Sequence, residues 1–151
     1  MSIKVIVTNR KAWHEYQILD KYEGGIVLYG SEVKAIREGK ANIKEAYVRF
    51  SGNELFVIGM HIGKYSHEGY STHTPVRDRK LLLHKRELKK MRKMVDEKGK
   101  TLIPLSIYFK GGNVKIEFGL AQGKKLWDKR KAKMEKDVNR QVDRALKSYK
   151  N

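Results

Sequence analysis

The sequence contains no cysteine among its 151 residues. Disulfide bonds and zinc sites with cysteine ligands are therefore excluded, and the composition is compatible with a reducing cytosol. Long hydrophobic runs are missing as well. No segment approaches the roughly 18 consecutive apolar residues of a membrane-spanning helix, and the N-terminus lacks the apolar core of a signal peptide. We therefore expect a cytoplasmic protein with no membrane partner.

Signatures of catalysis are also missing. Neither of the glycine-rich motifs that cradle phosphate, G-x-x-x-x-G-K-[ST] and G-x-G-x-x-G, occurs in the chain. The five histidines follow no metal-binding spacing, and without cysteine or paired carboxylates they predict no metal site. Glu23 and Glu32 could each act as a base, but no acid is paired with either of them. We expect a protein that is not an enzyme and that uses no metal or cofactor.

Positive charge is what the sequence has in excess. It holds 34 Lys and Arg against 17 Asp and Glu, a formal net charge of +17. Such a chain repels itself unless a polyanion is present, so the charge predicts a nucleic acid or an anionic membrane surface as partner. Because no membrane-directed segment is recognisable, nucleic acid is the favoured partner.

Alternating apolar residues and glycine-containing turns predict six or seven short strands, mostly joined as hairpins. The expected strands are 3–7, two within 16–30 separated by Gly24-Gly25, two within 46–62 around Ser51-Gly52-Asn53, 101–109 and 114–121. A short helix is expected after Ser31 as its cap, ending at Gly39. A helix of about 14 residues is expected to end near Gly99, because Leu88, Met91 and Val95 recur at helical spacing. Residues 63–78 have no period and predict a loop.

These elements predict a mainly β fold: an OB-like antiparallel β-barrel with two or three short helices and a basic C-terminal tail. The barrel is expected to occupy residues 1–121. From about Gln122 the strand pattern stops, and residues 122–151 carry Lys and Arg far in excess of Asp and Glu. One narrow apolar stripe runs through this tail. It is compatible with a helix packed on the barrel, but the one-sided charge favours an arm that stays disordered until RNA neutralises it.

A few side chains stand out on the expected surface. Glu23 is an acid beside two glycines in a basic chain, and the simplest interpretation is a solvated turn residue. Lys34 and Arg37 are expected on the outer side of their helix, where single cations commonly serve solubility alone. The run "RKLLLH" at 79–84 is different, because three consecutive leucines cannot all face one core from a strand. One leucine could therefore be exposed and pack on a nucleotide or sugar. The alternative, equally compatible with the run, is that it ends one strand and starts a buried helix.

Five blocks of the sequence resemble one known family. They are "NRKAWHEY", "YEGGIVLYGSEVKAIREGKANI", "RKLLLHKREL", "KGKTLIPLSIYF" and "GLAQGKKLWDKR". In this order and spacing, from about Asn9 to Arg130, they resemble small protein B, the bacterial SsrA-binding protein family. The resemblance implies an OB-like barrel that binds the tRNA-like part of transfer-messenger RNA (tmRNA, or SsrA RNA). It further implies that protein and RNA enter stalled ribosomes together in trans-translation, where the ribosome is rescued and the unfinished polypeptide is tagged.

The resemblance also assigns roles to individual residues of the barrel. Glu23, Leu82, His84 and Lys115 match the family's RNA contact surface, and Asn9 and Lys11 are expected as neighbours on it. The full set assigned to RNA binding is Asn9, Lys11, Glu23, Lys34, Arg37, Leu82, His84, Lys115, Lys124 and Lys125. Two positions depart from the common family pattern. His84 stands where relatives often have Asn, and Glu117 stands where they often have a cation, which could weaken a local backbone contact.

In the tail, the resemblance assigns ribosome contacts to Trp127, Asp128, Lys129 and Arg130. It implies a tail that becomes helical in the decoding centre and the empty messenger channel, with the Trp127 ring stacked on a small-subunit ribosomal RNA base. The chain itself is expected to act as a monomer. The alternatives to this interpretation are a ribosomal protein and a general RNA-binding or chaperone protein. They would be distinguished by which RNA co-purifies with the tagged protein.

Overall fold

The structure, a computed structural model, describes residues 2–66, 73–96 and 99–123. Within them a seven-stranded antiparallel sheet carries most of the chain. Its strands are β1 (Ile3–Thr8), β2 (Tyr16–Ile26), β4 (Tyr47–Ser51), β5 (Glu54–Ile58), β7 (Arg79–Leu82), β8 (Lys100–Lys110) and β9 (Asn113–Gly123). Two two-residue strands, β3 (Ala41–Asn42) and β6 (His61–Ile62), pair separately. The helices are α1 (Arg10–Glu15), α2 (Gly30–Arg37) and α3 (Lys85–Val95).

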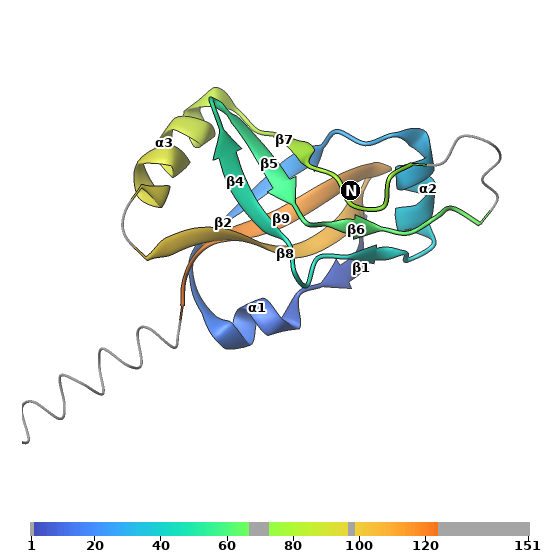
Figure 1. The fold of residues 1–151 in the computed structure, drawn as a ribbon, viewed down its shortest axis with the longest axis horizontal. Coiled ribbons are helices and arrows are strands. Elements are labelled where there is room, and N and C mark those ends of the chain that lie inside the picture. The colour runs from blue at the N-terminus through green and yellow to red at the C-terminus, as the bar shows by residue number, and fades with distance from the viewer. Residues whose placement is uncertain (1, 67–72, 97–98, 124–151) are drawn as a thin grey trace, which may run out of the picture.

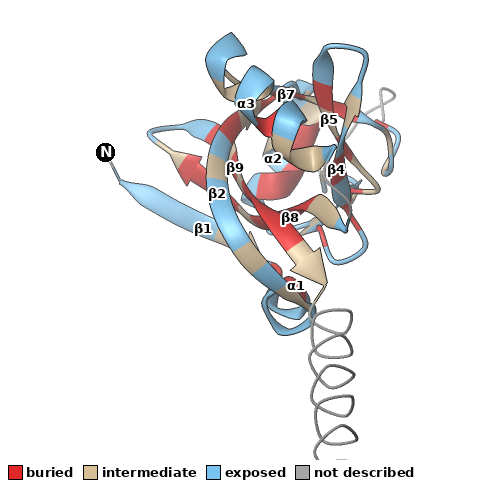
Figure 2. Cartoon of the chain, turned by 90° about the vertical axis from the view of Figure 1, so that its left-hand side faces the viewer, coloured by how far each residue is buried: buried red, intermediate tan, exposed pale blue. Residues whose placement is uncertain are grey.

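The sheet closes on itself. Its order is β1-β8-β4-β5-β7-β2-β9, and β9 pairs back with β8, so six strands form a ring and β1 extends from it along β8. Figure 2 shows this ring of strands, with the ribbon coloured by burial. Phe118, Ile116, Val57 and Leu102 are fully buried inside the ring, because outward-facing residues alternate with inward-facing ones along each strand. The predicted mainly β, barrel-like fold with short helices is confirmed.

Helices α3 and α2 lie toward opposite ends of the barrel, and α1 lies beside β8 (Figure 1). Helix α2 places the fully buried Ala35 and Ile36 in the main core, and α3 adds Met91. Helix α1 packs on the outside of β8, where Ala12 contacts Ile103 and Leu105. Burial of these apolar faces, rather than helix propensity, stabilises such short helices.

Two glycines form the connection between β8 and β9. The hairpin between β8 and β9 turns through Gly111 and Gly112, with φ of +58° and +92°. Both glycines can adopt this left-handed geometry without steric cost, as type I′ hairpin turns require. The predicted hairpin is confirmed, although its strands are longer than expected. The last strand extends to Gly123, two residues beyond the boundary expected after Ala121.

The expectation of two strands on either side of Gly24-Gly25 is wrong. β2 runs without interruption from Tyr16 to Ile26, with its irregularity between Ile18 and Asp20 instead. A Cβ atom at Gly24 would lie only 2.9 Å from Leu83 Cδ1 and 3.2 Å from the Leu82 carbonyl oxygen. Gly24 therefore permits a close approach of β7 to β2 rather than a turn.

Three details of the helices also differ from expectation. Helix α1 was not predicted, because its six residues are mostly polar and bury only Ala12. Ser31 is not the cap of α2. The helix begins at Gly30, two residues earlier than expected, and its N-cap residue is Tyr29, whose backbone N–H donates to Glu32 Oε1 at 2.8 Å. The Ser31 hydroxyl instead hydrogen-bonds His73 Nδ1 at 3.0 Å. Helix α3 has 11 residues, shorter than the expected 14.

Candidate nucleic-acid interface

Four of the residues assigned to RNA binding lie around one surface depression. Glu23 on β2, Leu82 on β7, His84 at the start of α3 and Lys115 on β9 all line it. The remaining lining residues are Gly24, Gly25, Leu83 and Glu87. We call Glu23, Leu82, His84 and Lys115 the β2–β7–β9 surface. It brings together residues that are as far apart in sequence as Glu23 and Lys115.

The strand register explains how these side chains meet. Gly25 pairs with Leu82 on one side and with Lys115 on the other. A Cβ atom at Gly25 would lie 3.6 Å from Leu82 Cβ and 3.9 Å from Lys115 Nζ. The leucine and the lysine therefore converge over a glycine that leaves the centre of the depression open. One apolar and one cationic side chain face the same space.

Glu23 is held on this surface by two residues of β8. Its Oε2 accepts a hydrogen bond from the Tyr108 hydroxyl, and its Oε1 accepts one from Lys110 Nζ at 3.2 Å. The Tyr108 bond, then Lys110 and the nearby charge of Lys115, lower the pKa of Glu23 below the usual carboxyl range. Burial and the same hydrogen bond raise the pKa of Tyr108. Glu23 is thus an ionised, oriented acceptor; it is solvent-exposed, as expected, but lies on strand β2 rather than in a turn.

The leucine run exposes one of its three residues. Leu81 is 2% exposed and packs in the core, Leu83 is half-buried, and Leu82 is 52% exposed. The interpretation with one exposed leucine is confirmed. His84 follows directly as the N-cap residue of α3, where its carbonyl accepts from the Leu88 N–H while its side chain makes no capping hydrogen bond. The imidazole is therefore not needed by the helix and is exposed beside Leu82.

A second depression extends this surface toward α2. It shares Gly25, Leu82 and Lys115 with the first and adds Val33 and Asn113. Arg37 lies one helical turn after Val33, with its guanidinium 5.2 Å from the centre of the Phe109 ring. Lys34 Nζ lies 5.4 Å from the centre of the Tyr65 ring. Both cations are exposed, as expected, at the α2 end of the barrel.

Asn9 and Lys11 lie away from the depression. Asn9 is 4% exposed: its side chain accepts from the Ala12 N–H at 3.2 Å and donates to the Pro104 carbonyl at 3.0 Å. These bonds start α1 and attach it to β8, so we leave Asn9 out of the proposed surface. Lys11 is exposed and pairs with Glu45 at 3.5 Å. Glu117 pairs with Glu23 in the β2–β9 register, which places two acids side by side.

The predicted tail contacts lie outside the described residues. They are Lys124, Lys125, Trp127, Asp128, Lys129 and Arg130. Their roles stay predictions. The described part of the chain contains no helix long and apolar enough to cross a membrane. Residues 2–66, 73–96 and 99–123 also contain no group of three or more acidic, histidine or cysteine side chains placed to hold a metal ion.

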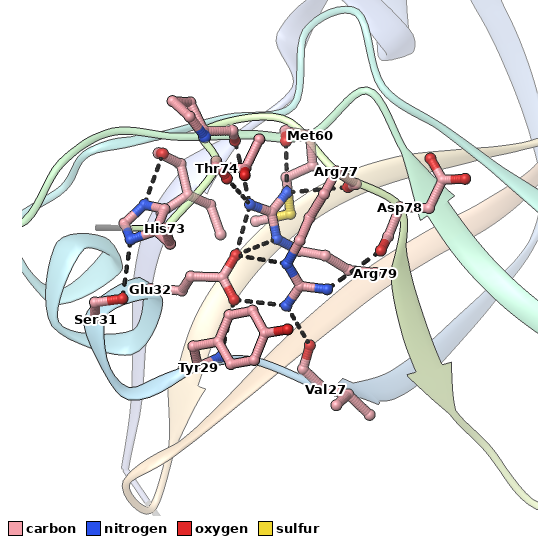
Figure 3. A network of polar contacts seen from close by, with 12 residues as sticks. Val27, Tyr29, Ser31, Glu32, Met60, His73, Thr74, Arg77, Asp78 and Arg79 are labelled. Carbon is pink, nitrogen blue, oxygen red and sulfur yellow. Dashed lines mark hydrogen bonds and ion pairs between the residues drawn. The ribbon is translucent and has the colours of Figure 1, made fainter. Parts of the chain in front are cut away.

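Sequence reasoning missed a buried ion-pair network beside α2 (Figure 3). Glu32 and Arg79 are both fully buried, and their side chains approach to 2.6 Å. Arg77 donates to the same carboxylate at 2.6 Å. Burial opposes ionisation of Glu32, but hydrogen bonds from Arg77, the Tyr29 backbone and Arg79 outweigh it and lower its pKa. The sequence offered no signal for this network, because Glu32 and Arg79 belong to separate elements.

Arg79 also hydrogen-bonds the backbone of two segments that precede it in the chain. Its guanidinium donates to the Met60 carbonyl at 2.7 Å and to the Pro75 carbonyl at 3.2 Å. His73 is nearly buried and bridges Ser31 Oγ and the Ile62 carbonyl, each at 3.0 Å. A buried arginine that satisfies several carbonyls orders the loop that carries them. The network therefore fixes residues 73–79 and the position from which β7 starts toward Leu82.

These features define a small OB-like antiparallel barrel whose outer surface combines a cation, an ionised acceptor and an exposed leucine in a strongly basic chain. The family model described as SmpB protein matches residues 6–148. The chain is 51% identical to the SsrA-binding protein of Syntrophobacter fumaroxidans, over 95% of this chain and 89% of that protein. It is 48% identical to the SsrA-binding protein of Carboxydothermus hydrogenoformans, over 96% and 97% of the two chains. The chain belongs to the SmpB family of SsrA-binding proteins.

A solved structure gives the same assignment. It is described as "tmRNA-SmpB: a journey to the center of the bacterial ribosome". The matching chain is 45% identical, with a TM-score of 0.66, over 78% of this chain and 82% of that one. The likeness in fold thus accompanies a substantial likeness in sequence.

Proposed function

We propose that this protein binds the tRNA-like domain of tmRNA through its β2–β7–β9 surface and acts with that RNA on stalled ribosomes in trans-translation. The observation that carries the proposal is the single depression lined by Glu23, Leu82, His84 and Lys115. These four residues come from three strands and one helix start, in a member of a family named for SsrA binding. Selective contact with a folded RNA is the use that suits them together.

The chemistry of the surface supports selectivity rather than general attraction. Lysine side chains alone attract any phosphate backbone. Folded RNA is recognised by shape, by unstacked bases and by contacts to 2′-hydroxyls. The Glu23 carboxylate can accept from a base or a 2′-hydroxyl, and its bond to Tyr108 fixes its direction. Leu82 adds an apolar contact for a sugar or base face. A general RNA chaperone would need neither the oriented acid nor the exposed leucine.

We assign the barrel and the tail to different RNAs. The barrel, which ends with β9 at Gly123, contacts tmRNA, and the tail that follows it contacts small-subunit ribosomal RNA. A tail helix of about 25 residues would be near 38 Å long, which suits a channel that normally holds messenger RNA. Lys124 and Lys125 would contact RNA phosphates, and the Trp127 ring would stack on a base. The protein would work in the bacterial cytoplasm, as a monomer, without catalysing a reaction.

Co-purification tests this function directly. Tagged protein isolated from the bacterium that encodes it is expected to carry tmRNA as its main bound RNA, with ribosomes at lower abundance. Ribosomal RNA in equal amount to the protein would indicate a ribosomal protein. A mixture of cellular RNAs without tmRNA enrichment would indicate a general RNA-binding protein. Either result would overturn the proposal.

Replacing Lys115 by Ala should remove about one phosphate contact from the barrel. We expect weaker binding of the tRNA-like domain and a salt dependence, log Kd against log salt concentration, whose slope falls by somewhat under one unit. Arg49→Ala is the matched control, because Arg49 is an exposed cation on β4, across the ring from β2. An equal change of slope for both variants in a binding titration would show that Lys115 contributes only general charge.

A further inference from the structure

An exposed apolar row continues the β2–β7–β9 surface beyond Gly25. Val27 N donates to the Lys80 carbonyl at 2.9 Å, so the chain after β2 still follows β7. Val27 is 45% exposed and Tyr29 is 62% exposed, and Val76, the residue before Arg77, is 50% exposed. Val27 lies two residues beyond Gly25, the strand partner of Leu82, so Val27 and Leu82 share the outer face of this strand pair. Val27, Tyr29 and Val76 are not among the four residues assigned above.

The Tyr29 ring lies against a guanidinium that is fixed in place (Figure 3). The Arg77 guanidinium carbon lies 4.5 Å from the centre of the Tyr29 ring. Arg77 cannot move freely, because it donates to Glu32 at 2.6 Å and to the Asp78 carbonyl at 3.2 Å. The buried network thus holds the cation, and the cation holds the ring by a cation–π contact.

The Tyr29 backbone is fixed as well. Its N–H donates to Glu32 at 2.8 Å, and its carbonyl accepts from the Val33 N–H at 3.1 Å. The ring is therefore positioned at both its backbone and its Arg77 side, while most of its surface remains exposed. A tyrosine has two side-chain torsions, so little entropy remains to be lost when a partner covers such a ring.

We propose that Tyr29 is a stacking position for an unpaired nucleobase of the bound RNA. The inference rests on the proposed function and extends its surface along β2. One face of the ring lies against the Arg77 cation, and a base would cover exposed ring surface. Aromatic side chains stack any base, because every base has a π face. The exposed Val27 side chain, two residues before Tyr29, would pack against the edge of the base or its sugar.

The observations favour RNA over a protein partner on this row. Gly25 lines both depressions together with Leu82 and Lys115, and Tyr29 follows it by four residues along a segment that still pairs with β7 at Val27, so an RNA bound there passes close to Tyr29. The chain carries a net charge of +17, which attracts polyanions. Unstacked bases of folded RNA are commonly stacked on aromatic side chains or on arginine guanidinium planes.

The test measures binding of a tRNA-like-domain transcript by the full chain at several salt concentrations. Tyr29→Ala should weaken binding by roughly five- to 150-fold, the range measured for loss of one stacked base. The salt slope should not change, because no phosphate contact is lost. Tyr29→Phe should bind within about two-fold of the parent protein, and Tyr29→Leu should resemble Tyr29→Ala. Tyr47→Ala is the control, since Tyr47 is an exposed tyrosine on β4 across the ring.

Several outcomes would overturn the inference. Unchanged affinity for Tyr29→Ala, while Lys115→Ala weakens binding, would leave the proposed function intact and remove Tyr29 from the surface. Full affinity for Tyr29→Leu would show an apolar contact without stacking. Unchanged RNA affinity with reduced peptide tagging would indicate a protein or ribosomal partner at this row. Absence of binding by the parent protein itself would overturn both proposals.

Discussion

Deleting residues 124–151 is expected to abolish peptide tagging on stalled ribosomes while leaving the barrel folded and able to bind tmRNA. The deletion removes no part of the sheet, because β9 ends at Gly123. Affinity for tmRNA should fall only several-fold, through loss of the nonspecific attraction of the tail cations. Tagging should be lost because the segment proposed to occupy the messenger channel is gone.

The boundary matters for this experiment. Gln122 pairs with Gln17 and with Lys100, and Gly123 pairs with Tyr16. Truncation after Ala121 would remove these strand residues and is expected to lower the melting temperature, whereas truncation after Gly123 should not. Peptide tagging is measured on ribosomes stalled on a messenger without a stop codon. Tagging at the full rate by the shorter chain would refute the division of labour between barrel and tail.

The substitution Trp127→Ala tests whether one side chain of the tail is needed for peptide tagging. Trp127 is surrounded in sequence by Lys124, Lys125, Lys129 and Arg130. Burying the indole against the barrel would draw these cations toward apolar surface, and desolvating one of them unpaired costs several kcal/mol. We therefore expect nearly unchanged thermal stability with reduced tagging, and partial recovery with Trp127→Tyr or Trp127→His. A drop of several degrees in melting temperature would show that the ring anchors the tail to the barrel.

Replacing Glu32 by Ala is expected to have the largest effect on folding. Arg79 is fully buried, and the substitution would leave its charge without its carboxylate partner. Removing one member of a buried ion pair typically costs about 3–5 kcal/mol. For a chain of this size that corresponds to a fall in melting temperature of roughly 10 °C. The loop that Arg79 ties to Met60 and Pro75 should become accessible to protease at the same time.

The same carboxylate makes stability depend on pH. Because the pKa of Glu32 is lowered in the folded protein, its contribution is fully present above the unfolded value of about 4.5. It is lost as the pH falls through the lowered, folded-state pKa. Unfolding by denaturant at a series of pH values should therefore show a steeper acid dependence in the parent protein than in Glu32→Ala.

Glu38→Ala is the control for the predicted fall in melting temperature of Glu32→Ala. Glu38 is an exposed residue at the end of α2 that accepts from the Ser66 N–H at 3.0 Å. Its removal leaves no buried charge unpaired, so its effect should be much smaller than that of Glu32→Ala. Equal melting temperatures for the two variants would show that the buried network adds no stability.

Local pattern was enough to predict most of the fold. Period-two alternation and the glycine turn at 111–112 predicted the β8–β9 hairpin, and Ser51 to Asn53 predicted the β4–β5 hairpin. The failures arose where tertiary packing decides the local structure. Helix α1 is stabilised by the contacts of Asn9 and Ala12 with β8 rather than by its own pattern. The Gly24-Gly25 pair indicated a turn in the sequence. In the structure Gly24 instead allows β7 to lie close to β2.

The candidate site, like the fold, could be predicted from the sequence only in part. The family motifs indicated Glu23, Leu82, His84 and Lys115, and the strand register brings them together. The hydrogen bond from Tyr108 to Glu23 could not be predicted. Tyr108 follows Glu23 by 85 positions and belongs to a strand whose residues are mostly buried. The role of Glu32 was equally hidden, since its partner Arg79 lies 47 positions away. Pairings over such distances depend on how the sheet closes.

One measurement tests the central claim most directly. It is the affinity of the purified triple variant Glu23→Ala, Leu82→Ala, Lys115→Ala for the isolated tRNA-like domain, with thermal melting to establish that the barrel is folded. If these side chains form one RNA-binding surface, the folded variant should lose most of its affinity for that domain while keeping weak, salt-sensitive binding to unrelated RNA. Binding of the tRNA-like domain with the affinity of the parent protein would contradict the account.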